Sequence, residues 1–220
     1  MSGVILRICF IVFLFAAVGA AQAQSPSSVR GNAFALGVHM GFASFALHEA
    51  DREPERDALG FEIFASRQSR ERWCSRAKSE MTSAGTNVAG VNSYLASASP
   101  ENRLSAPDIS AAGDLTCPAE QFVVNLRGGY SATLARGPAD LANAYNLGVN
   151  IGIAEIQASV GEPARQIVIA SLSNARGQVS ALGLNAQPLE DAFNLAISNA
   201  SMTVVHERVL SARTTYQSSL

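Results

Sequence analysis

The chain has 220 residues, of which 48% are apolar, 15% are charged and 7% are aromatic, and its formal net charge is −2. This composition excludes a polar, intrinsically disordered chain and a polycation that binds nucleic acid through charge. The length is sufficient to bury one sizeable hydrophobic core. We therefore expect a compact globular domain that does not bind nucleic acid.

Residues 1–23 are predicted to form a secretory signal peptide. Arg7 precedes an apolar run, and residues 21–23 have the small-x-small pattern of a cleavage site. The apolar stretch over residues 8–21 has 14 residues, fewer than the roughly 20 that a membrane-spanning helix needs. A permanent membrane anchor is the weaker alternative. We expect residues 24–220 to be a single α-helical domain that is periplasmic or secreted.

Two cysteines remain after removal of the predicted signal peptide. Cys74 and Cys117 are an even pair in a chain that is expected to enter an oxidising compartment, so they are predicted to form a structural disulfide. The loop that this bond closes would contribute about 4 kcal/mol in the chain-entropy description. A reactive or metal-binding thiol pair is the alternative, but the close C-x-x-C spacing of such sites is absent from the sequence.

Two blocks of sequence recur in the same order. Residues 32–43 match residues 143–154 with Asn on Asn, Gly on Gly and Ala on Ala, and residues 77–87 match residues 175–185 more loosely. This pattern predicts a tandem duplication, although chance similarity between two Ala-rich helical segments is an alternative. The predicted division is repeat 1 over about 28–98, a linker over about 99–118 and repeat 2 over about 138–215.

The first repeat contains an insertion of 13 residues, because the offset between the copies falls from 111 in the first block to 98 in the second. The candidate insertion is the charged stretch over residues 48–57, whose counterpart is the short turn around residues 161–163. Insertions in one copy of a repeat often map to a functional face. The stretch is therefore a candidate functional segment.

Apolar residues recur at intervals of three and four in each copy, which predicts amphipathic helices. The second helix of each copy is predicted to end at Gly85 or Gly183, because glycine suits the left-handed position that follows a helix. Asn87 and Asn185 are then predicted to cap the helices that follow.

The remaining segments are predicted to be helical with defined breaks. A helix over residues 119–126 is expected to end at Arg127-Gly-Gly-Tyr130, and Gly137-Pro138 is expected to start the first helix of the second repeat. The last helix is expected to run without interruption from Leu189 to Val209. The glycosylation sequon at Asn199 would lie inside it.

Four glycines occupy the predicted helix interiors, where each costs roughly 1 kcal/mol relative to alanine. Gly37 and Gly41 lie four residues apart on one helix face, as do Gly148 and Gly152 in the second copy. We expect the two helices to cross there, backbone to backbone, near a pseudo-twofold axis. The alternative is that this bare face admits a flat ligand or a partner helix. The predicted fold is an all-α helical bundle of two tandem, pseudo-twofold-related repeats.

Candidate binding residues are few. His39 is singled out because Asn150 occupies the matching position of the second copy, and Met40 adjoins it. A metal or haem site would use His39, Met40 and His48, with His206 as a further ligand. Isolated polar residues on amphipathic helices are the alternative, because the sequence has no H-x-x-x-H or H-E-x-x-H motif.

Other motifs indicate no chemistry. Ser75-x-x-Lys78 matches the S-x-x-K of serine acyltransfer enzymes, but its S-D-N and K-T-G partner motifs are missing. The chain also lacks a nucleophile elbow, a P-loop and a dinucleotide fingerprint. A basic stretch is interpreted as a solvated helix face that pairs with the carboxylates of the insertion, with an anion or partner site as the alternative. It consists of Arg67, Arg70, Arg72, Arg76 and Lys78.

The sequence thus predicts an exported, non-catalytic helical module that binds an unidentified small molecule or protein, or serves a structural role. It identifies no cofactor and predicts no permanent membrane anchor. The alternative function is a periplasmic or secreted metal or haem carrier that uses His39, Met40 and His48.

Overall fold

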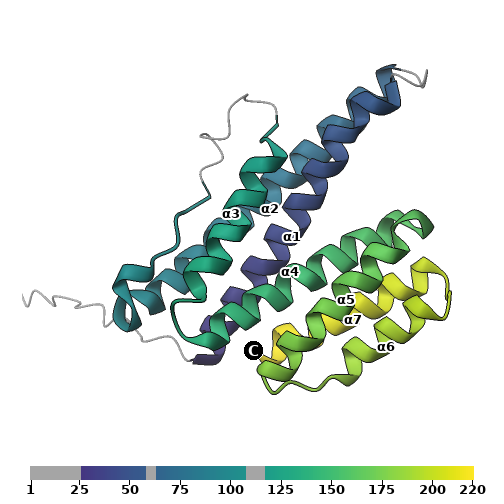
Figure 1. Cartoon of the computed structure of the whole chain (residues 1–220). Helices are drawn as coiled ribbons and strands as arrows, with labels where there is room; N and C mark the ends of the chain where they lie inside the picture. Colours follow the sequence, from purple (N-terminus) through teal and green to yellow (C-terminus); the bar gives the residue numbers. More distant parts are fainter. Residues whose placement is uncertain (1–25, 58–62, 108–116) are drawn as a thin grey trace, which may run out of the picture.

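A computed structural model describes residues 26–57, 63–107 and 117–220 (Figure 1). The described residues form seven α-helices that pack into one domain, and they contain no strand, so the all-α prediction is confirmed. The predicted signal peptide lies outside the described residues. The helices are α1 (Pro26–Asp57), α2 (Ile63–Ala98), α3 (Glu120–Leu134), α4 (Ala139–Val160), α5 (Arg165–Ala181), α6 (Gln187–Ile197) and α7 (Met202–Ser219).

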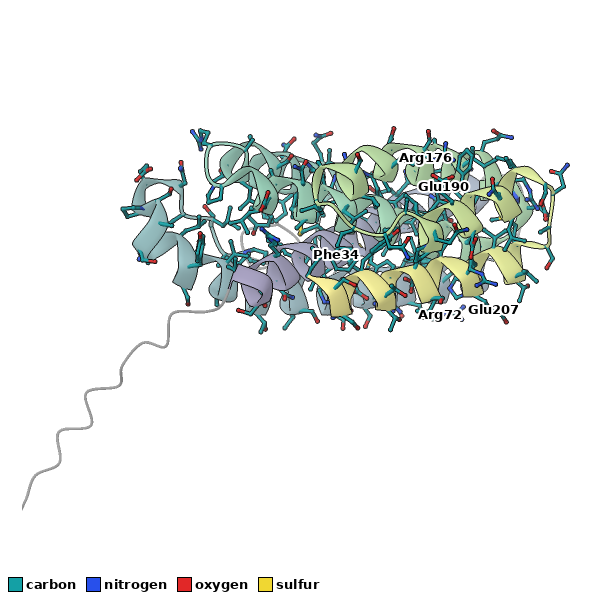
Figure 2. The ribbon with its side chains drawn as sticks, turned by 90° about the horizontal axis from the view of Figure 1, so that it is seen from below. Phe34, Arg72, Arg176, Glu190 and Glu207 are labelled. Carbon is teal, nitrogen blue, oxygen red and sulfur yellow. A yellow bond between two sulfur atoms is a disulfide. The ribbon has the colours of Figure 1, made fainter. Side chains whose placement is uncertain are left out.

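Helices α1 and α4 lie side by side in the centre of the domain (Figure 1). Helix α2 packs along α1, and α5 packs along α4. Helix α3 contacts both central helices, and α7 also contacts both, while α6 packs between α5 and α7. The central helices supply fully buried side chains to the core, among them Phe34, which Figure 2 shows in the interior. Their apolar stripes are therefore covered from several sides.

The four glycines lie where α1 and α4 cross, and backbone touches backbone there. A Cβ atom on Gly37 would lie less than 3.0 Å from the carbonyl oxygen of Tyr145. A Cβ atom on Gly148 would lie equally close to the carbonyl oxygen of Phe34. The next glycine on each helix repeats this approach, with a Cβ atom at 2.8 Å for Gly41 and 2.6 Å for Gly152 from a carbonyl oxygen of the opposite helix. Any side chain at these positions would push the helices apart.

The predicted end of a helix at Gly85 is wrong, because α2 continues through it to Ala98. The Asn87 side chain donates to the Ser83 carbonyl of the same helix rather than capping a new one. The physical reason is the apolar stripe of α2, which stays buried on both sides of Gly85 from Ala77 to Leu95. Burial along this stripe offsets the propensity cost of one glycine.

The predicted turn at Gly183 is confirmed. Gly183 has φ 65°, the Leu184 N–H donates to the Val179 carbonyl at 3.0 Å, and the Gly183 N–H donates to the Ser180 carbonyl at 3.1 Å. These are the two hydrogen bonds of a Schellman motif. The side chain of Asn185 then accepts from a backbone N–H at the start of α6. The same residue pattern therefore ends a helix at Gly183 but not at Gly85.

Two further predicted boundaries are wrong. Helix α3 runs through Gly128 and Gly129 to Leu134, because the flanking residues Val123 and Tyr130 are buried on one face. The expected last helix is divided into α6 and α7 by a turn in which Asn199 has φ 58°. The glycosylation sequon therefore lies in an exposed turn and not in a helix. The predicted start of α4 after Pro138 is confirmed.

Two arginines of α5 hold α6 in place. Arg165 donates to the carbonyl oxygen of Ala196 in the last turn of α6 at 2.7 Å and to that of Ala200 in the following turn at 2.6 Å. Arg176 Nε donates to Glu190 Oε1 at 2.8 Å across the α5–α6 contact (Figure 2). These long-range contacts explain why the chain turns after Ile197.

The predicted disulfide is confirmed, with Cys74 and Cys117 bonded and their Cα atoms 5.1 Å apart. The bond ties the segment before α3 to α2. The linker between α2 and α3 is also anchored by Asn92, whose side chain accepts from the Leu104 N–H and donates to the Leu104 carbonyl, both at 2.8 Å. Along the described part of the chain, no helix combines the length and apolarity needed to cross a bilayer.

Three buried tyrosines predict a loss of stability at high pH. The hydroxyls of Tyr130, Tyr145 and Tyr216 donate to the carbonyls of residues 105, 127 and 185, respectively. Burial raises the pKa of all three hydroxyls, that of Tyr216 to about 12. The unfolded chain ionises near pH 10 while the folded chain keeps these protons, so the free energy of unfolding is expected to fall as pH rises above about 10.

This expectation is checked by thermal unfolding between about pH 9 and about pH 11, with phenolate absorbance recorded in parallel. The buried tyrosines should ionise only as the helical signal is lost. Tyrosines that all titrate near pH 10 in a chain that remains helical would contradict the expectation.

Candidate functional site

Two adjoining hollows share Trp73 and Arg76, and together we name them the Trp73 groove. Helix α2 forms one wall, α4 and α7 form the other, and Phe42 of α1 contributes to the lining. One hollow has a volume of about 260 Å³ and the other about 340 Å³. The first is lined by Phe42, Trp73, Arg76, Glu155, Ile156, Ser159 and His206, and the second by Ser69, Arg72, Trp73 and Arg76.

Trp73, the only tryptophan of the chain, provides the aromatic wall. Its ring packs edge to face against Phe45, with centroids 5.7 Å apart and planes at 88°, and it is partly buried against the core. The next residue, Cys74, is fixed by the disulfide. The indole is therefore held from both the core side and the backbone, so its orientation is set before any ligand arrives.

Arg76 is positioned by a buried carboxylate. Its Nε lies 2.6 Å from Glu80 Oε1, and the other carboxylate oxygen of Glu80 lies 2.6 Å from His39 Nδ1. Glu80 is only 7% exposed, whereas the Arg76 side chain is 51% exposed. The guanidinium also stacks 5.4 Å from the centroid of the Phe42 ring. Arg76 therefore presents an oriented cation at the solvent side of the groove.

Glu155 is the second buried carboxylate of the groove. Its Oε2 lies 2.7 Å from Arg213 Nε, as an ion pair that is not aligned as a hydrogen bond. Burial raises the pKa of Glu155, while Arg213, His206 and Arg76 oppose this shift and Glu80 adds to it. Arg213 also lies 5.9 Å from the centroid of the Phe42 ring. The buried side of the groove therefore holds the Glu155–Arg213 ion pair, in which the two charges compensate each other.

The Trp73 groove is assembled from four helices, of which α4 and α7 are far in sequence from α1 and α2. No known protein family, curated protein or solved structure matches this chain. The chemistry of a ligand therefore has to be inferred from the side chains that line the groove.

The structure does not bring the candidate residues from the sequence together. His39 is partly exposed and pairs with Glu80 beside the groove, whereas Met40 is fully buried in the core. His48 is exposed and lies 3.4 Å from a carboxylate of Glu120, about 14 Å further along α1 than His39. Asn150, on α4, donates to a backbone carbonyl one turn earlier in the same helix.

His206, the further candidate, lines the Trp73 groove and contributes to the electrostatic environment of Glu155. Across the part of the chain that the structure describes, no three His, Cys, Asp or Glu side chains are grouped so that they could hold a metal ion. His39, Met40 and His48 consequently lie in three different environments. A metal or haem site formed by them stays a prediction.

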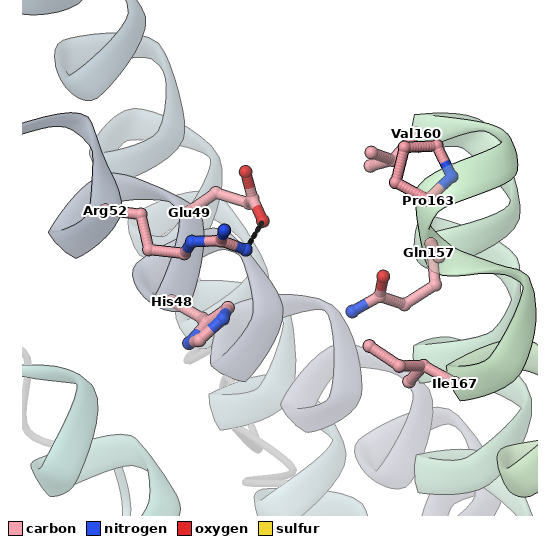
Figure 3. Close-up of a pocket in the computed structure, with 8 residues that line it drawn as sticks. His48, Glu49, Arg52, Gln157, Val160, Pro163 and Ile167 are labelled. Atoms are coloured by element: carbon pink, nitrogen blue, oxygen red, sulfur yellow. Dashed lines mark ion pairs between the residues drawn. The ribbon is translucent and has the colours of Figure 1, made fainter. Parts of the chain in front are cut away.

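A separate hollow of about 190 Å³ lies between α1 and the α4–α5 turn (Figure 3). His48 belongs to this hollow together with Glu49 and Arg52, whose charged atoms are 3.9 Å apart. On the opposite side, the exposed apolar side chains of Val160 and Ile167 point toward it. The charged stretch over residues 48–57 is the C-terminal part of α1, and its first residues line this hollow. The hollow is smaller than the Trp73 groove, and its described lining contains no Phe, Tyr or Trp.

The sequence interpretation missed the Trp73 groove. Its only local signal is an aromatic residue between two arginines on one helix face, at positions 72, 73 and 76. Arg76 of the basic stretch pairs with Glu80 of its own helix. The expected pairing of this stretch with the carboxylates of residues 53–57 falls on side chains outside the described residues. The residues from α4 and α7 have no sequence signal at all, because only packing brings them to α2.

Proposed function

We propose that the protein is an exported, non-catalytic module that binds a small ligand in the Trp73 groove. The observation that supports this most directly is the fixed indole of Trp73 beside the oriented guanidinium of Arg76. Binding sites for small molecules combine an apolar or aromatic wall with a few placed polar groups in a concavity of this size. Export is supported by the disulfide, which is typical of oxidising compartments.

Pre-organisation is the physical reason for preferring binding over a purely structural role. A half-exposed arginine loses considerable side-chain entropy when a ligand immobilises it. The Glu80 carboxylate and the Phe42 ring already restrain Arg76 in the free protein. Folding has therefore already restricted this side chain. A ligand that contacts it loses less side-chain entropy, so its binding free energy is more favourable.

We also propose that α1–α2 and α4–α5 descend from a tandem duplication. The contacts at the helix crossing support it because they are reciprocal. Gly37 approaches the Tyr145 carbonyl and Gly148 approaches the Phe34 carbonyl, and a shift of 111 positions converts each contact into the other. Helices α3 and α7 each pack on both central helices, which fits the same relation. A pseudo-twofold axis that runs between α1 and α4 accounts for both observations.

If the copies are equivalent, the groove belongs to the first one alone. The positions that match Trp73 and Arg76 are Ser171 and Asn174, which provide neither a large apolar wall nor a cation. The position that matches His39 is Asn150. The duplication would thus have supplied the scaffold, and later divergence of one copy would have supplied the binding residues.

The binding proposal predicts that one neutral dye molecule per chain enters the groove. We expect N-phenylnaphthylamine to gain fluorescence with the folded protein and to quench Trp73 by energy transfer, since the dye would lie against the indole. Ser159→Phe should weaken dye binding at least fivefold, because an exposed residue on the rim would then fill the hollow. The matched control Ser173→Phe adds the same ring to an exposed position of α5, outside the groove, and should leave binding unchanged.

Equal dye binding by the two phenylalanine variants would place the dye elsewhere and count against the groove. The same conclusion would follow if the folded protein failed to bind the dye at all. Helical circular dichroism of both variants checks that each remains folded.

A further inference from the structure

We infer that the ligand of the Trp73 groove is a small organic carboxylate with an apolar body. The carboxylate would bind at Arg76 and the apolar body would lie against Trp73 and Ile156. This inference rests on the proposed binding function and specifies the chemical class of the ligand. The carboxylate acceptors of the groove already pair with protein cations, whereas N–H donors of Arg76 can still bind a ligand.

The carboxylates of the groove already face cations of the protein. The two oxygens of Glu80 lie 2.6 Å from Arg76 Nε and from His39 Nδ1. Glu155 Oε2 lies 2.7 Å from Arg213 Nε. An arginine has five N–H donors, and the pair with Glu80 engages the Nε group of Arg76, whose side chain remains half exposed. The groove therefore offers donors, and a ligand has to bring acceptors.

A cationic ligand fits this arrangement poorly. The ring of Phe42, where a ligand cation would gain a cation–π contact, already has Arg76 at 5.4 Å and Arg213 at 5.9 Å from its centroid. Glu155, the carboxylate that lines the groove, is 8% exposed and held by Arg213. A ligand ammonium would have to displace an arginine from each of these positions. An anion needs no such displacement.

The apolar lining sets the rest of the ligand. Trp73 and Ile156 line the hollow of about 260 Å³, and Trp73 also borders the hollow of about 340 Å³ that contains Arg72. A short aliphatic chain or a single ring can lie against these surfaces while its carboxylate reaches a guanidinium. A bare inorganic anion would leave the aromatic wall without a contact, so the apolar body is part of the inference.

The test compares octanoate, octanol and octylammonium, which share one chain and differ in charge. Each is titrated into the folded protein while the emission of Trp73 is followed, since this is the only tryptophan. We expect octanoate to bind at least about tenfold more tightly than the other two, as a charge-assisted hydrogen bond to arginine gives. Arg76→Gln should remove this preference, so that octanoate binds no more tightly than octanol.

Arg208→Gln is the matched control, because Arg208 is equally exposed, at 49%, and pairs with Asp191 away from the groove. This variant should keep the full preference for octanoate. If circular dichroism shows that Arg76→Gln does not fold, Arg72→Gln serves as the second variant. Its expected result is a weaker preference for octanoate, because Arg72 lines the adjoining hollow.

The outcomes separate this inference from the proposed function. Equal binding of the three probes, or tighter binding of octylammonium, would overturn the carboxylate while leaving a binding groove. Binding of N-phenylnaphthylamine with no binding of octanoate would do the same. If neither the dye nor any of the three probes binds, both the inference and the proposed function fail. A preference for octanoate that survives Arg76→Gln and Arg72→Gln would show that the arginines of the groove do not create it.

Discussion

Replacing Gly148 with alanine is expected to lower the melting temperature by about 10 °C or to prevent folding. In an ordinary helix interior this change would stabilise the protein by about 1 kcal/mol. Here the new Cβ atom would lie less than 3.0 Å from the backbone of α1 at Phe34, which cannot turn aside as a side chain can. Separating the central helices is expected to cost about 4 kcal/mol, above the usual range for overpacking, and each kcal/mol corresponds to roughly 2–4 °C.

Gly129→Ala is the matched control for this prediction. Gly129 also lies inside a helix, but it is exposed and a Cβ atom there would have no neighbour within 4 Å. We expect this variant to be more stable than the unmodified protein by up to about 1 kcal/mol. Thermal unfolding followed by circular dichroism compares the two. If Gly148→Ala raised the melting temperature as Gly129→Ala does, the close crossing of α1 and α4 would be contradicted.

The same substitution at Gly37 examines the proposed duplication. Gly37 makes the reciprocal approach to the backbone at Tyr145, so a pseudo-twofold crossing predicts that Gly37→Ala and Gly148→Ala cost the same within about 1 kcal/mol. A large effect at one glycine with a neutral effect at the other would count against a symmetric crossing. The double variant is expected to be less than additive, because once the helices have moved apart the second Cβ atom meets less resistance.

Features with a strong local or covalent cause could be predicted from the sequence. The helical periodicity predicted an all-α fold because burial of an apolar stripe determines where helices form. The pair Cys74 and Cys117 predicted the disulfide because no third cysteine remains once the predicted signal peptide is removed. Gly183 predicted a helix end because glycine suits the left-handed position after a helix and Asn185 can accept a hydrogen bond at the start of the next one.

The wrong boundaries share one cause, which is that packing between helices outweighs local propensity. Gly85 and Gly129 each lower the local helical propensity, yet α2 and α3 continue because buried residues lie on both sides of them. At Asn199 the effect of packing is reversed, because a helix ends just before it although the local sequence pattern would continue it. The helical pattern is interrupted there, and Arg165, more than 30 residues earlier, binds the Ala196 carbonyl in the last turn of α6 and the Ala200 carbonyl in the turn that follows. Neither effect has a signal within a short window of sequence.

The Trp73 groove could not be predicted for a related reason. Arg76 and Trp73 are neighbours on one helix, but Glu155 and His206 reach them only through the crossing of α1 and α4 and the packing of α7. A ligand-binding site made by packing has no fixed residue spacing, unlike a phosphate loop or a metal-binding helix. The candidate residue His39 contacts Glu80, which in turn pairs with Arg76, so His39 lies at the edge of this site. Only the structure shows this connection.

Loss of the disulfide is expected to lower the free energy of unfolding by about 4 kcal/mol, and the melting temperature by about 10 °C. The bond closes a loop between Cys74 and Cys117, which are 43 positions apart, and so restricts the unfolded chain. The double variant Cys74→Ala, Cys117→Ala removes the bond and leaves small apolar side chains at two buried positions. Thermal unfolding of the variant and of the protein with and without a reductant measures the effect. The reductant should leave the double variant unchanged.

The position of the disulfide also predicts where stability is lost. Cys117 holds the segment that leads into α3, and Cys74 adjoins the indole of Trp73. Without the bond, amide hydrogens of α3 should exchange faster and the emission of Trp73 should shift to longer wavelength as the groove opens to water. The amides of α4 at Gly148 should keep their protection, because the helix crossing does not depend on this bond. Uniform loss of protection across all helices would contradict this and show that α3 unfolds only together with the rest of the domain.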